Sequence, residues 1–176
     1  TILEARHPSE IDLGLDRVSE VWCRLNAKRE TISSKVAPII VTVAGTNGKG
    51  SCIAAMQAIL LAHDYSVGDF TSPHFLEYNE RISIAGVSVS DESIVDAFAA
   101  IESVRGEVSL TYFEFNTLAA LVIFDQYELD IVLLEVGLGG RLDAWVEAKF
   151  RSQGWHVQQL RWGAHAQALF ALDGGD

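Results

Sequence analysis

A glycine-rich loop between a predicted strand and a predicted helix constrains this chain more than any other feature. The loop, residues 45–51, reads Gly-Thr-Asn-Gly-Lys-Gly-Ser. It follows the β-branched run 39–43, which predicts a strand buried on both faces, and it precedes residues 50–62, which have a helical composition. Backbone N–H groups, the start of a helix and a lysine together favour the phosphates of a nucleotide, and Ser51 could offer its hydroxyl to magnesium.

The loop departs from the general phosphate-loop pattern of glycine, four residues, then Gly-Lys-[Ser/Thr]. Val43 stands where the first glycine is expected, and Gly50 follows the lysine. A glycine-rich turn after a strand is often only a tight turn, and that reading stays open from the loop alone. The run 130–135 predicts a second buried strand that ends at Glu135. A carboxylate at the carboxyl edge of a parallel sheet lies where α/β proteins bind ligands, so it favours the nucleotide site over a solvated strand-end glutamate.

The remaining pattern alternates helices and strands and predicts an α/β domain with a mostly parallel sheet. We expect an amphipathic helix over about 13–25, a strand at 66–70, a polar stretch at 71–81 and a short hairpin around Gly86. Two further helices are expected at 91–104 and about 113–127.

The charge balance argues against a nucleic-acid-binding protein. The chain has 13 Lys+Arg against 24 Asp+Glu and a formal net charge of -11, whereas affinity for a polyanion needs cations that neutralise phosphates. Cys23 and Cys52 have no metal-binding spacing, and reduced buried thiols are expected. No apolar run approaches the roughly 20 residues of a membrane helix, and no signal peptide is recognised. A soluble cytoplasmic protein without a membrane partner is expected.

Composition changes near residue 144. Residues 1–144 carry 10 basic and 21 acidic side chains, whereas residues 145–176 carry three of each. The later segment also holds three of the four tryptophans, Trp145, Trp155 and Trp162. We therefore expect a boundary at this point.

Several motifs in sequence order resemble the bifunctional dihydrofolate synthase/folylpolyglutamate synthase family. They are the segments 11–15, 43–51, 71–75, 110–115 and 134–144. This family belongs to the ATP-dependent Mur-type ligases, whose phosphate loop has the same Gly-Thr-Asn-Gly-Lys form. The resemblance implies a P-loop-containing, Mur-ligase-like ATPase domain with a mostly parallel, incomplete sheet. Residues 1–144 would be the N-terminal part of its ATP- and pterin-binding domain.

The resemblance also implies a reaction. Members transfer the γ-phosphoryl group of ATP to a substrate carboxylate, and the amine of L-glutamate then attacks the acyl phosphate. Dihydropteroate and tetrahydrofolate would be the acceptors, Mg²⁺ the metal ion, and a monomer the state of the intact enzyme. Positioning and charge neutralisation suffice for this chemistry, so no side-chain nucleophile is needed.

Site residues follow from the matching positions. Lys49 and His74 are the catalytic candidates, although a lone loop histidine is often structural. ATP would meet Thr46, Asn47, Gly48 and Lys49, with Ser51 close by; the metal would meet Ser72 and Glu135. The pterin substrate would meet Asp12, Leu13, Gly14, Thr111, Tyr112, Phe113, Leu142, Asp143 and Ala144. Two alternatives stay open: Phe113 as plain core and Asp12 as a helix N-cap.

After Ala144 the chain departs from the family pattern, reading Trp-Val-Glu-Ala-Lys over 145–149. The later family motifs and the C-terminal ligase domain are not found. An internal deletion, an out-of-frame end and an authentic short variant are three accounts of this divergent tail, the first slightly favoured because 158–172 vaguely resembles a later β region. The alternative function is a catalytically silent fragment that retains at most ATP or pteroate binding. Missing strands would expose sheet edges, so marginal solubility is expected.

Overall fold

A computed structural model describes residues 16–28, 37, 39–45, 47–136 and 156–161 of the 176-residue chain. Its strands are β1 Ile39–Ala44, β2 Val67–Phe70, β3 Ile82–Ile84, β4 Val87–Ser88, β5 Ile131–Val136 and β6 His156–Arg161. They form a sheet in the order β4-β3-β2-β5-β1-β6. Neighbours among β2, β5, β1 and β6 are parallel, whereas β3 and β4 add an antiparallel hairpin at one edge. The α/β class and the mostly parallel sheet are confirmed.

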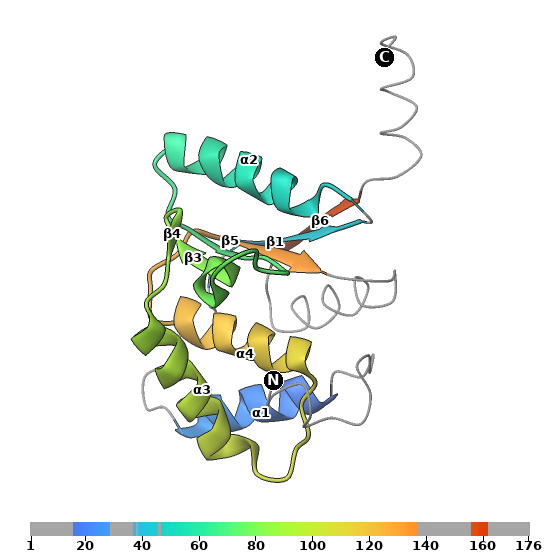
Figure 1. The fold of residues 1–176 in the computed structure, drawn as a ribbon, viewed down its shortest axis with the longest axis vertical. Coiled ribbons are helices and arrows are strands. Elements are labelled where there is room, and N and C mark those ends of the chain that lie inside the picture. The colour runs from blue at the N-terminus through green and yellow to red at the C-terminus, as the bar shows by residue number, and fades with distance from the viewer. Residues whose placement is uncertain (1–15, 29–36, 38, 46, 137–155, 162–176) are drawn as a thin grey trace.

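Helices cover both faces of this sheet (Figure 1). They are α1 Asp16–Lys28, α2 Lys49–Ala62, α3 Asp91–Arg105 and α4 Tyr112–Phe124, with a short 3-10 helix, η2, at Tyr78–Arg81. α2 packs on one face, and α4 lies on the other with α1 and α3 beyond it (Figure 1). None of the helices in the described ranges is both long and apolar enough to cross a membrane.

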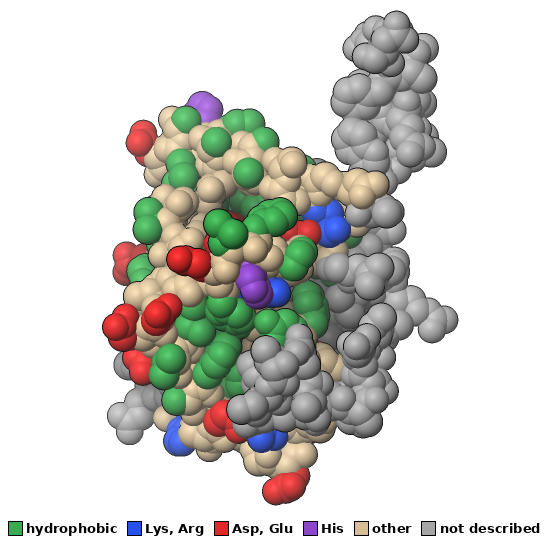
Figure 2. All heavy atoms as spheres, viewed as in Figure 1, with side chains coloured by type: hydrophobic (Ala, Val, Ile, Leu, Met, Phe, Trp, Pro, Cys, Tyr) green, Lys and Arg blue, Asp and Glu red, His purple; other side chains and the backbone are tan. Residues whose placement is uncertain are grey.

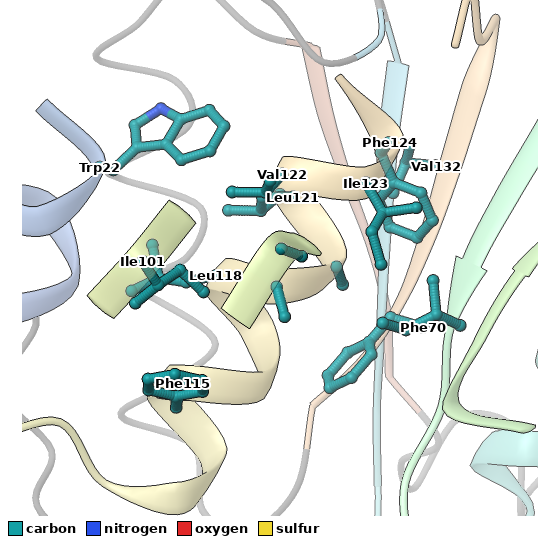
Figure 3. Close-up of a cluster of buried hydrophobic side chains, with 14 of the residues drawn as sticks. Trp22, Phe70, Ile101, Phe115, Leu118, Leu121, Val122, Ile123, Phe124 and Val132 are labelled. Atoms are coloured by element: carbon teal, nitrogen blue, oxygen red, sulfur yellow. The ribbon is translucent and has the colours of Figure 1, made fainter. Parts of the chain in front are cut away.

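The expected burial of β1 on both faces is confirmed, and it divides the core in two. Val41 and Val43 pack with Ile53 of α2, whereas Ile40 points into the larger cluster on the α4 side. Figure 3 shows that larger cluster, in which side chains of α1, α3 and α4 meet those of β2 and β5. Because α4 lies between the sheet and two helices, it is buried around most of its circumference, and its second half, Leu118–Phe124, is wholly apolar.

Element boundaries shift slightly from the predicted ones. α4 ends at Phe124 rather than near Tyr127, because Gln126 and Tyr127 donate to the carbonyls three residues back and so form a turn. The segment 71–81 is more than a polar stretch, since it ends in η2 and presents Phe75 and Leu76 to solvent, 91% and 90% exposed.

β6 is the part of the fold least evident in sequence. It lies beyond residue 144, in the segment that departs from the family pattern, and it pairs in parallel with β1 along the whole of that strand, from Ile39 opposite His156 to Ala44 opposite Arg161. The tail therefore contributes to the same sheet as the phosphate-loop strand.

A small buried polar cluster attaches α2 to the sheet. Gln57 of α2 and Ser83 of β3 both donate to a carboxylate oxygen of Asp69 in β2. Burial raises the pKa of Asp69, and the hydrogen bond from Ser83 opposes that rise. These contacts fix the distance between α2 and the strands beneath it.

Candidate nucleotide site

The phosphate loop connects the carboxyl end of β1 with the start of α2. Gly48 is the N-cap of α2, with φ 75° and ψ 4°, and Lys49 is the first helical residue. The first N–H groups of a helix have no carbonyl partner inside it, and they carry the positive end of the helix dipole. This end of α2 is exposed at Asn47, Gly48 and Gly50, so it is open to an anionic ligand.

Glu135 lies directly beside this loop. It occupies the next-to-last position of β5 opposite Val43 of β1, and its side chain is buried. Its Oε1 lies 3.5 Å from Nζ of Lys49, and its Oε2 accepts a hydrogen bond of 3.0 Å from the backbone N–H of Ser72. The structure thus brings together three predicted site residues from three separate segments.

The oxygen atoms of Glu135 and of the Ser72 and Ser51 hydroxyls suit a hard cation. Mg²⁺ is usually held by one or two carboxylates while phosphates and water supply its other ligands. Within the described residues, no group of three or more His, Cys, Asp or Glu side chains could hold a metal. The donor set therefore fits an ion that arrives with a nucleotide better than one caged by protein alone.

His74 lies in the loop between β2 and η2 and has a partner that sequence reasoning missed. Nδ1 of His74 accepts a 2.8 Å hydrogen bond from Nε of Arg81. The guanidinium of Arg81 is buried and lies 5.6 Å from the ring centre of Tyr78 and 5.4 Å from that of Tyr112. No signal in a single sequence marks this arginine, because the contact depends on how η2 meets α4.

Tyr78 joins this group to α4. Its hydroxyl hydrogen-bonds Oδ1 of the buried Asn116. Burial raises the pKa of Tyr78 above its usual range, Tyr112 acts in the same direction, and Arg81 opposes both. The tyrosine stays neutral at physiological pH and serves as a fixed packing surface for Arg81 and His74.

The predicted pterin residues at 111–113 begin α4. The hydroxyl of Thr111 accepts from the N–H of Glu114, whose carboxylate accepts from the N–H of Thr111, a reciprocal capping box. Phe113 is half-buried against the core, and its ring centre lies 6.2 Å from that of Phe70. Thr111 and Phe113 therefore have structural roles whatever they bind. The other candidates lie outside the described residues: Asp12, Leu13, Gly14, Thr46, Leu142, Asp143 and Ala144.

Known proteins resemble this chain over most of its length. No protein-family model matches it. The dihydrofolate synthase/folylpolyglutamate synthase of Escherichia coli (strain K12) is 51% identical over 142 residues, which make up 81% of this chain and 32% of that protein. The chain thus matches the N-terminal part of this synthase family. It spans about a third of the length of the curated relatives it matches.

Solved synthase structures agree in fold. The structure described as E. coli FolC in complex with DHPP and ADP has a TM-score of 0.72 and 50% identity, and covers 80% of this chain and 32% of its own. A bifunctional folylpolyglutamate synthase/dihydrofolate synthase with Mn, AMPPNP and L-glutamate bound has a TM-score of 0.71 and 51% identity, with the same coverage. The predicted Mur-ligase-like fold is confirmed by this likeness.

Proposed function

We propose that this chain is the ATP- and pterin-binding part of an ATP-dependent ligase that adds L-glutamate to dihydropteroate, to folylpolyglutamate, or to both. The observation that carries the proposal is the contact of Lys49 and Glu135 beneath the Gly-Thr-Asn-Gly-Lys loop. It is supported by the synthase relatives and by the nucleotides and glutamate named for the solved structures. We further propose that the intact enzyme is cytoplasmic and monomeric. Its partners would be small molecules rather than nucleic acid or membrane.

The chain's own residues would act by holding and neutralising charge. The N–H groups at the start of α2 and the ammonium of Lys49 would bind the ATP phosphates, so that the terminal phosphoryl group can pass to a substrate carboxylate. The acyl phosphate then supplies the leaving group for attack by the glutamate amine. Glu135 and Ser72 would hold Mg²⁺, which supplies further neutralisation of phosphate charge when bound. Asp12–Gly14, Thr111–Phe113 and Leu142–Ala144 would bind the pterin.

The phosphate-loop assignment is tested by replacing its lysine. Lys49→Met removes the positive charge and keeps much of the side-chain volume, and the matched control is Lys28→Met at the exposed end of α1. Because hydrogen bonds to charged groups are worth about 1.5–3 kcal/mol, ADP affinity should fall tenfold or more in the first variant and stay unchanged in the second. Isothermal titration calorimetry measures both. Equal affinity in both variants would remove the assignment.

A second function is favoured by the share of the relatives that this chain spans, about a third of their length. In that case the chain binds nucleotide or pteroate and catalyses nothing by itself. Glutamate-dependent ADP release by the purified chain, with dihydropteroate or tetrahydrofolate as acceptor, separates the two. Turnover supports the ligase, whereas retained ADP binding without turnover supports the silent fragment.

A further inference from the structure

The loop that carries Ser72 and His74 is tied back onto η2 by two contacts. The carboxylate of Glu80 accepts hydrogen bonds from the backbone N–H groups of Phe75, Leu76 and Glu77, at 2.7, 3.0 and 3.0 Å. The second contact is the hydrogen bond from Arg81 to the imidazole of His74. Both therefore fix the orientation of the loop relative to η2.

The second contact specifies where the imidazole carries its hydrogen. A guanidinium has five N–H donors, no acceptor, and is not deprotonated in proteins. Nε of Arg81 must therefore be the donor across the 2.8 Å separation, and Nδ1 of His74 must present its lone pair. In a neutral imidazole only one nitrogen carries a hydrogen, so that hydrogen is on Nε2.

Arg81 is itself held in place. Its side chain is buried at 7% exposure, and its guanidinium lies near the rings of both Tyr78 and Tyr112. The imidazole of His74 is also near Tyr78, with ring centres 5.8 Å apart. A buried arginine whose guanidinium lies near two aromatic rings has little freedom to turn away, and this favours its hydrogen bond to His74.

We propose that Arg81 is a positioning residue that holds His74 as the tautomer with its hydrogen on Nε2, so that His74 offers a ligand a hydrogen-bond donor. The ligand would supply an anionic oxygen, from a phosphate or a carboxylate. The kind of ligand rests on the proposed function, whereas the tautomer of His74 does not depend on it. His74, predicted as a catalytic residue, then binds rather than accepts a proton.

The tautomer is measured by nitrogen NMR of the full chain labelled with ¹⁵N-histidine, at about pH 8.5, where ordinary imidazoles are neutral. His63 is the internal reference, because its side chain is exposed at the end of α2. His74 should show an unprotonated Nδ1 and a protonated Nε2 without averaging between tautomers. A protonated Nδ1 overturns the proposal. This result does not depend on any ligand, so it is separate from failure of the proposed function.

Removing the donor tests the role of Arg81. Arg81→Met keeps the apolar stem and should shift the Nδ1 signal of His74 towards the averaged signal of His63, whereas Arg105→Met, which lies on α3 away from His74, should leave it unchanged. An unchanged His74 signal in folded Arg81→Met overturns the positioning role. If that variant does not fold, the wild-type measurement still decides the tautomer.

The source of the oxygen is tested by adding MgADP alone and dihydropteroate alone, with binding followed by calorimetry. A shift of the Nε2–H signal with MgADP assigns the donor to a phosphate, and a shift with dihydropteroate assigns it to the substrate. Binding of both ligands without any shift overturns the donor role.

Discussion

Lys49 and Glu135 have opposite charges that would each be costly to bury alone. Their side chains are 17% and 6% exposed, and 3.5 Å separates Nζ from Oε1. A buried ion left without a partner is strongly destabilising, so each residue makes the other tolerable at this position. The pair also keeps the ammonium and the carboxylate beside the start of α2, where an anionic ligand and its cation would need them.

Gly48 contributes backbone conformation rather than charge. Its φ of +75° is in the left-handed region, and an added Cβ would meet no atom within 4 Å. The cost of Gly48→Ala is therefore conformational, and we expect a loss of roughly 1–2 kcal/mol in the free energy of unfolding. Gly48→Asn should lose less, because asparagine tolerates this region better. Chemical denaturation measures both values.

Gly50→Ala is the matched control for this prediction. Gly50 lies in the first turn of α2, and its added Cβ would be 4.0 Å from Oε2 of Glu135, an ordinary contact. We expect little change or a gain in stability, since alanine favours the helix. Equal destabilisation by both alanines would contradict the conformational argument.

Single residues differ in how far sequence predicts their role. The glycines and the lysine of the loop, taken together with Glu135 at the end of a second predicted strand, predict that Lys49 and Gly48 meet phosphate. Arg81 carries no such signal, since its partners Tyr112 and His74 are far from one another in sequence. The role of Thr111 as N-cap is written locally in the Thr-x-x-Glu pattern, whereas its predicted contact with pterin depends on the family resemblance alone.

At the scale of elements, the loop 72–77 and η2 form one unit held by Glu80. Hydrogen bonds from the backbone N–H groups of Phe75 and Glu77, and then from that of Leu76, lower the pKa of Glu80, whereas desolvation opposes this lowering. Because the folded pKa lies below the ordinary value of about 4.3, the charged carboxylate stabilises the loop above that value. This stabilisation should be lost as the pH falls through the lowered pKa.

Amide hydrogen exchange measures this loss. Protection of the N–H groups of Phe75, Leu76 and Glu77 should be constant from about pH 7 to pH 5 and then fall as the pH is lowered further. Glu80→Gln should reduce their protection already at neutral pH, whereas Glu92→Gln, an exposed residue of α3, should not. Full protection in Glu80→Gln would contradict the role of the carboxylate.

β2 lies so close to the end of α4 and to Leu129 that a side chain at Gly68 would force its neighbours to move. A Cβ at Gly68 would approach Cδ1 of Leu129 to 2.8 Å and Cδ1 of Phe124 to 2.9 Å. Since the side chain of Phe124 is fully buried, Gly68→Ala should destabilise the domain by about 1–3 kcal/mol, or roughly 2–4 °C per kcal/mol in Tm. Calorimetry of Gly68→Ala/Leu129→Ala should show a smaller combined loss than the sum of the single losses. Additive losses would show that the two sites are not in contact.

For the whole molecule, sequence predicts the layers better than the edges of the sheet. The spacing of apolar residues along the sequence accounts for which helices and strands form. The apolar runs 39–43 and 130–135 become two central strands, β1 and β5. The neighbour of β1 could not be predicted, because pairing with β6 depends on a segment whose composition differs from the rest. On the face presented in Figure 2, the described residues include only a few scattered basic side chains.

The parallel pairing of β6 with β1 means that the segment after residue 144 helps to stabilise the domain. Without β6, the apolar β-branched strand β1 would become an edge that can pair with other chains. A chain shortened to residues 1–155 should therefore aggregate or melt without cooperativity, whereas one shortened to residues 1–161 retains β6 and should melt like the full chain. Size-exclusion chromatography and thermal unfolding by circular dichroism distinguish the two. A monodisperse 1–155 chain with the Tm of the full chain would show that β6 contributes nothing, and the phosphate loop would then depend on β5 alone for its position.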